Sequence, residues 1–158
     1  MRRVLASVVC AAAVAIAISI PLPALASGSC SVVSSTAINF GATVIPGRTN
    51  VLSLSTVSST CSAGASYTVA FDHGLNPTGA GLSQRRQLAS GSNFIVYDLY
   101  SDSARTITWG DGTNVGAAVA GTGTGGSQMS VVYGRIANVP TTTPVGSYAD
   151  TVTITVTF

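Results

Sequence analysis

Charge is scarce in this chain, and two of the charged residue types are missing altogether. The 158 residues include no lysine and no glutamate, so the charged side chains are seven arginines and five aspartates. Arg2 and Arg3 lie in an N-terminal segment that we expect to be removed, and the remaining five arginines balance the five aspartates. Without a basic patch, the sequence offers no electrostatic footprint for nucleic acid or anionic lipid.

Residues suited to catalysis are equally few. His73 is the only histidine and lies beside Asp72, but the aspartate of a catalytic triad orients its histidine across space, not from the adjacent position. No G-x-S-x-G motif supplies a nucleophile. The sequence therefore predicts no enzyme and no catalytic residues, with His73 as an ordinary turn residue.

No cofactor or metal motif occurs with the neighbouring structure or the spacing that it needs. Gly121, Gly123 and Gly126 fit the pattern G-x-G-x-x-G, but the Gly- and Thr-rich tract leads into another strand pattern, whereas a pyrophosphate site needs a helix N-terminus. The five aspartates show no calcium-loop spacing. We predict neither a cofactor nor a metal.

The long apolar run lies at the N-terminus. Two arginines precede an apolar stretch that ends near Ile20, and Ala24-Leu-Ala26 followed by Ser27 forms an A-x-A cleavage site. The pattern predicts a secretory signal peptide over residues 1–26, cut between Ala26 and Ser27, and one domain over residues 27–158. A retained membrane anchor is the alternative, because the run approaches the ~18 to 20 apolar residues of a span.

Cysteine usage agrees with export. Cys10 lies inside the predicted signal peptide, which leaves Cys30 and Cys61 as an even pair in an oxidising compartment. They flank two strand-like runs joined by a turn at Pro46-Gly-Arg48, and an antiparallel hairpin would bring them together. A disulfide there would stabilise the fold by about 3 to 4 kcal/mol in the chain-entropy model. A redox or metal role is the alternative, but no C-x-x-C motif supports it.

The rest of the sequence has the pattern of β-strands. No 11-residue window beyond the signal shows a convincing helical period. Short strand-like runs recur between turn signals, which predicts an all-β fold and favours a sandwich over a barrel. The runs are Val32–Phe40, Val51–Cys61 with a bulge near Val57, Tyr67–Phe71, Phe94–Tyr100, Arg105–Gly112, Met129–Ile136 and Tyr148–Phe158. Residues 113–127, rich in Gly, Thr and Ala, are predicted to form a flexible hairpin arm or loop.

The last nine residues alternate strictly. Val152, Ile154, Val156 and Phe158 would face one way and four threonines the other. Beyond Asp150 the stretch has no charge, proline or glycine, which are the devices that keep a sheet edge from pairing with another chain. We therefore expect a further strand to lie beside this one, supplied by this chain or by another protein.

Landmarks of a known family are spread along the chain, namely Cys30, Phe40-Gly41, Cys61, Arg86-Gln-Leu88, Tyr97-Asp-Leu-Tyr100-Ser-Asp102, Trp109-Gly-Asp-Gly112, Tyr133-Gly-Arg-Ile136 and Gly146-Ser-Tyr148-Ala-Asp150 with the strand to Phe158. Together they resemble those of the spore coat protein U domain family, which includes the archaic chaperone–usher pilins of Gram-negative bacteria. The likeness covers essentially the whole chain after the predicted signal peptide, in the family's order.

The resemblance implies an immunoglobulin-like antiparallel β-sandwich that lacks its final strand. A periplasmic chaperone would fill the gap first, and the N-terminal extension of a neighbouring subunit would replace it at an outer-membrane usher, which is donor-strand complementation. The protein would then be a secreted structural subunit of a surface fibre, a pilus, serving adhesion or biofilm formation. The implied contacts with the chaperone or donor strand are Tyr148, Val152, Ile154, Val156 and Phe158. The implied packing or salt-bridge positions are Arg86, Tyr97, Trp109 and Arg135.

Other functions remain open. One is a fibre-tip or surface-binding adhesin domain that contacts a surface or glycan through residues 101–128, and another is a spore or cell coat protein. After cleavage only Ser27-Gly-Ser29 would precede Cys30, a stretch too short and too polar to complete another subunit's sheet at about 3.3 Å per residue. We therefore expect a subunit that accepts a donor strand without giving one, at a fibre end or outside a linear polymer.

Overall fold

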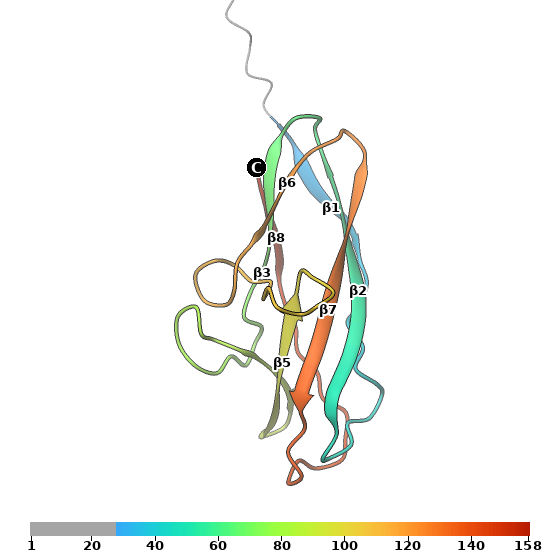
Figure 1. The fold of residues 1–158 in the computed structure, drawn as a ribbon, viewed down its shortest axis with the longest axis vertical. Helices are drawn as coiled ribbons and strands as arrows, with labels where there is room; N and C mark the ends of the chain where they lie inside the picture. The colour runs from blue at the N-terminus through green and yellow to red at the C-terminus, as the bar shows by residue number, and fades with distance from the viewer. Residues whose placement is uncertain (1–27) are drawn as a thin grey trace, which may run out of the picture.

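The computed structural model describes residues 28–158, in which eight strands and no helix are found. The molecule is elongated, and β2 and β7 run along its length (Figure 1). The strands are β1 (Cys30–Ser35), β2 (Thr49–Cys61), β3 (Ser66–Phe71), β4 (Arg86–Ser90), β5 (Asn93–Tyr100), β6 (Val119–Thr122), β7 (Ser127–Asn138) and β8 (Ile154–Thr157).

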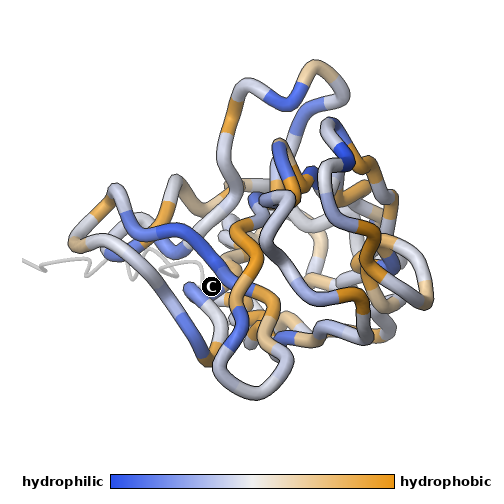
Figure 2. Tube along the Cα trace, turned by 90° about the horizontal axis from the view of Figure 1, so that it is seen from below, coloured by the Kyte–Doolittle hydropathy of each residue, from blue (hydrophilic) through white to orange (hydrophobic). Residues whose placement is uncertain are grey.

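Two antiparallel sheets pack into a sandwich. The larger has the order β1-β2-β7-β5-β4 and the smaller the order β6-β3-β8. Apolar and polar residues are interspersed along the trace when the molecule is seen from below (Figure 2), as expected for strands with one buried face. The buried core includes Val57, Val69, Phe71, Leu88, Ile95, Tyr97, Leu99, Trp109, Val132 and Ile136. The predicted all-β, immunoglobulin-like sandwich is confirmed.

A disulfide closes the first hairpin. Cys30 and Cys61 are direct partners in the β1–β2 ladder, with Cα atoms 4.1 Å apart, and their sulfurs are bonded. The prediction of a bulge near Val57 was wrong, because β2 pairs regularly with β7 through this region. The register shift lies instead in β1, between Val32 and Ser34.

Residues 105–112 do not form the predicted strand. Asp102 takes the place of a ladder partner, because its carboxylate accepts hydrogen bonds from the backbone N–H groups of Thr106 and Ile107. Side chains of this kind compete with sheet pairing. Only isolated bridges remain, one of them between Tyr100 and Thr108.

The Gly- and Thr-rich tract is more ordered than predicted. It contains β6, which pairs with β3. The Tyr67 ring covers Gly121 so closely that a Cβ atom there would lie 2.6 Å from the ring. Pairing with β3 and packing against Tyr67 therefore hold this tract in a regular strand, although its composition resembles that of a flexible loop. Strand β4 was not among the predicted runs.

Both terminal runs are shorter as strands than predicted. β1 ends at Ser35, although the chain continues beside β2 to Phe40. The last run pairs first with β4, through Ala149 and Ala89, and joins β3 only from Ile154 onward. The crossing between sheets interrupts the strand.

Candidate functional site

The last strand has one unpaired edge. β8 pairs with β3 through Thr68–Phe71, and within residues 28–158 no second strand is hydrogen-bonded to it. β1, an edge strand of the larger sheet, approaches β8 without pairing with it. The free N–H and C=O groups of such an edge can pair with an added strand.

A groove of about 540 Å³ opens beside this edge. One wall consists of residues 35–41, which begin at the end of β1, and the other of residues 148–154, which end at the start of β8. The floor is made of core side chains from both sheets, namely Val57, Phe71, Leu88, Tyr97, Leu99 and Val132. The groove thus reaches buried core side chains of both sheets and extends to Ile154, the first residue of β8.

Serine hydroxyls of β2 hold the first wall. Ser53 Oγ accepts a hydrogen bond from Asn39 N at 3.1 Å and donates one to Asn39 O at 2.7 Å. Ser55 Oγ donates to Thr36 O. These side chains replace the backbone ladder that ends with β1, so residues 36–41 are fixed without forming a strand.

Asp150 anchors the second wall. Its Oδ2 accepts a hydrogen bond of 2.7 Å from the Tyr97 hydroxyl, and its Oδ1 accepts one of 2.9 Å from Leu75 N. Burial, followed by the hydrogen bond to Asp150, raises the pKa of Tyr97, so its hydroxyl remains a donor at neutral pH. Asp150 lies where the chain passes from the larger sheet to the smaller.

The five side chains predicted to contact a chaperone or donor strand divide between two places. Tyr148, Val152 and Ile154 line the groove. Val156 is partly buried against the core, and Phe158 is 61 % exposed and lines a separate hollow beside Tyr67 and Gly121. The contacts themselves stay a prediction.

The first wall contributes apolar side chains that the sequence prediction did not include. Ile38 and Phe40 both line the groove and pack against the core. Their alternation within Ala37-Ile-Asn-Phe40 was the available signal, but it was interpreted only as part of a strand.

Arg86 and Trp109 are packing positions, as the family landmarks implied. Arg86 is fully buried, and its guanidinium donates to the carbonyl oxygens of Asp72, Phe71 and Trp109 at 2.7 to 3.0 Å. Burial lowers the pKa of Arg86. Trp109 Nε1 donates to Val69 O at 2.8 Å. Both side chains therefore bind backbone carbonyls of the core.

The arginine that forms an ion pair is Arg85, which was not one of the implied salt-bridge positions. Arg85 binds the Asp98 carboxylate through two N–H groups, whereas Arg135 stands directly across from Asp98 in the β5–β7 ladder. Arg85 was not among the predicted positions, because its partner lies on a neighbouring strand 13 residues away.

The side chains considered above for catalysis bond to backbone groups instead. Asp72 Oδ1 accepts hydrogen bonds of 2.9 Å from Gly74 N and Thr153 N, and His73 Nδ1 lies 2.8 Å from Gly74 O. Gly121, of the glycine-rich motif, lies in β6 and so on no helix.

Neither a metal cluster nor a membrane-spanning helix is found in residues 28–158. No group of three His, Cys, Asp or Glu side chains there is arranged to hold a metal ion. The same residues contain no helix that is long and apolar enough to cross a membrane. The predicted signal peptide and its cleavage between Ala26 and Ser27 lie outside the described residues and remain predictions, as does the acceptor-only role.

Comparisons with known proteins agree with this fold. No curated protein matches the sequence. A chain in the crystal structure of the CsuC-CsuE chaperone-tip adhesion subunit pre-assembly complex, from archaic chaperone-usher Csu pili of Acinetobacter baumannii, is similar with a TM-score of 0.58 and 24% identity. The match covers 83% of this chain and 40% of that chain. The family model of the Spore Coat Protein U domain matches residues 13–155, so the chain belongs to the Spore Coat Protein U domain family.

Proposed function

We propose that this protein is a structural subunit of a bacterial surface fibre that is assembled by donor-strand complementation. The observation that carries the proposal is the groove between residues 35–41 and 148–154, which opens onto core side chains beside the unpaired edge of β8. A strand inserted there would pair with β8 and place alternate side chains on the groove floor. This role is structural and needs no catalytic residue.

The proposed partners are a periplasmic chaperone, an outer-membrane usher and neighbouring subunits. The similar solved structure is titled as a chaperone and tip-adhesion-subunit complex, and the similarity of fold favours a comparable route for this chain. The subunit would pass through the periplasm and end at the cell surface. Because the match covers less than half of that chain, a shaft position and a tip position both fit.

The energetics favour a partner strand. Burying apolar surface contributes about 25 cal/mol per Å², and the floor and walls of the groove present several partly buried apolar groups, among them Ile38, Phe40 and Val152. Pairing with β8 would also remove an edge that could otherwise aggregate.

The test is chaperone capture with a matched pair of variants on β8. Ile154→Asp places a carboxylate in the groove, where an unpaired charge costs several kcal/mol, whereas Thr155→Asp places the same charge on the exposed face one residue away. We expect a co-expressed archaic pilus chaperone to co-purify with Thr155→Asp and not with Ile154→Asp. A wild-type chain that is soluble and monomeric alone, with the β8 edge protected from hydrogen exchange, would contradict the proposal.

A further inference from the structure

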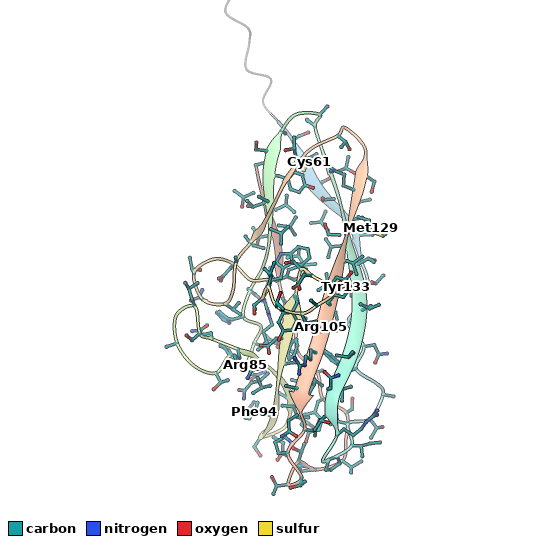
Figure 3. The ribbon with its side chains drawn as sticks, viewed as in Figure 1. Cys61, Arg85, Phe94, Arg105, Met129 and Tyr133 are labelled. Carbon is teal, nitrogen blue, oxygen red and sulfur yellow. A yellow bond between two sulfur atoms is a disulfide. The ribbon has the colours of Figure 1, made fainter. Side chains whose placement is uncertain are left out.

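The outer face of the larger sheet, on the side away from the core, brings charged and aromatic side chains together. In the ladder between β5 and β7, Tyr100 stands directly across from Tyr133. Arg105, in the loop after β5, has its guanidinium carbon 5.6 Å from the centre of the Tyr133 ring. Arg105 and Tyr133 lie next to one another in Figure 3, with Arg85 further along the same view.

Positive charge exceeds negative charge in this cluster, which holds three of the five arginines in residues 28–158. Arg85 binds Asp98, and the Tyr100 hydroxyl donates to the same carboxylate at 3.3 Å. Arg105 and Arg135 form no ion pair within residues 28–158. Asp98 therefore neutralises Arg85, and Arg105 and Arg135 supply the positive charge that has no ion-pair partner in the part of the chain that the structure describes.

The backbone holds Arg105 in a strained conformation. Its φ angle is 58°, in the left-handed region that residues other than glycine seldom adopt. The Asp102 carboxylate accepts hydrogen bonds from Thr106 N and Ile107 N, and is thereby committed to its own loop. Strain of this kind, which costs about 1 to 3 kcal/mol, is concentrated at functional sites.

We propose that this outer face binds an acidic polysaccharide. The carboxylate groups of the polymer would bind Arg135 and Arg105, whose guanidinium lies over the Tyr133 ring, since the guanidinium fork matches a carboxylate. One sugar ring would pack on Leu54, which stands directly across from Tyr133 on β2 and is 62 % exposed. The site does not depend on strand exchange, because it lies on the opposite side of the sheet from the groove.

The charge arrangement favours a polysaccharide over other polyanions. Nucleic acid binding commonly uses about six to ten phosphate contacts, and this face has three arginines in a chain without lysine. A polymer with one carboxylate per sugar suits so sparse a set of cations.

The test measures binding of the full chain, purified from the periplasm with any bound partner, to immobilised alginate at low salt. Arg105→Gln and Arg135→Gln should each weaken binding roughly tenfold, the loss expected for one charge-assisted contact. Arg48→Gln is the matched control, since it removes the same charge from an exposed position outside the cluster. Tyr133→Leu should also weaken binding while leaving the net charge unchanged.

Several outcomes would overturn the proposal. These are no binding to alginate, equal binding to neutral dextran, an equal loss in Arg48→Gln, or undiminished binding in the Arg105 and Arg135 double variant. Tighter binding to single-stranded DNA or to polyglutamate than to alginate would assign the face to nucleic acid or to an acidic protein instead. Thermal unfolding confirms that each variant is folded before its affinity is compared.

Discussion

The Tyr97 hydroxyl donates a hydrogen bond of 2.7 Å to the Asp150 carboxylate, and this bond joins the middle of the larger sheet to the segment that leads into the last strand. Tyr97 belongs to the floor of the groove and Asp150 to its second wall. This contact therefore ties the floor of the groove to its second wall.

Replacing Tyr97 by Phe should destabilise the fold by about 1.5 to 3 kcal/mol, because a hydrogen bond to a charged group is lost. Burial and Asp150 raise the pKa of Tyr97, so this stabilisation is present below the unfolded pKa of about 10 and is lost as pH rises above it. Urea unfolding at neutral and alkaline pH measures both effects. Tyr148→Phe, which removes an exposed hydroxyl, is the control, and an equal loss there would contradict the assignment.

The disulfide between Cys30 and Cys61 should contribute substantially to stability. Replacing either cysteine by Ser should cost roughly 2 to 5 kcal/mol and lower the yield of exported protein. Mass analysis without reductant should show a chain two hydrogens lighter than the reduced form. Free thiol at both positions in native material would refute the bond.

Asp72 should make the entry to β8 sensitive to acid. Partial burial acts to raise the pKa of Asp72, but hydrogen bonds from Thr153 and Gly74 outweigh it and lower the pKa. The resulting stability is present above the unfolded pKa of about 3.9 and is lost as pH falls through the lower folded value. Asp72→Asn keeps the acceptor oxygen without the charge, so its unfolding free energy should change less with pH below about 4 than that of the wild type. Identical acid profiles would count against this role.

The buried and exposed faces of a strand could be predicted where they follow hydropathy. The last strand alternates as its sequence indicates, with Val156 partly buried and Thr155 exposed. β2 reverses this rule, since Leu52 and Leu54 are 44 % and 62 % exposed while Ser53 and Ser55 are buried. The serines face inward because they hold the first wall of the groove. That wall could not be predicted, because its partners lie 14 to 19 residues away along the chain.

The cationic outer face was also beyond sequence analysis. Arg85, Arg105 and Arg135 are far apart in the sequence and come from a loop before β4, a loop after β5 and β7. Composition showed a balance of charges and no basic run, which is a correct statement about the sequence. Antiparallel pairing nevertheless places these side chains on one face.

Gly134 in the middle of β7 makes room for the first wall of the groove. A Cβ atom at Gly134 would lie 2.8 Å from Phe40 Cζ and 3.1 Å from Ile38 Cγ2. Gly134→Ala should therefore displace the wall and destabilise the fold by about 1 to 3 kcal/mol, as overpacking does. Gly126→Ala is the control, because the nearest atom to a Cβ there is 3.9 Å away.

A second substitution separates this clash from a general effect of losing glycine. Phe40→Leu shortens the side chain that the new methyl group would meet, so the double variant should lose less stability than the sum of the two single variants. Residues in contact show such coupling, typically about 0.5 to 3 kcal/mol. Urea unfolding of the wild type, the two single variants and the double variant completes a double-mutant cycle. Strictly additive losses of stability would show that Phe40 does not contact the methyl group added at Gly134.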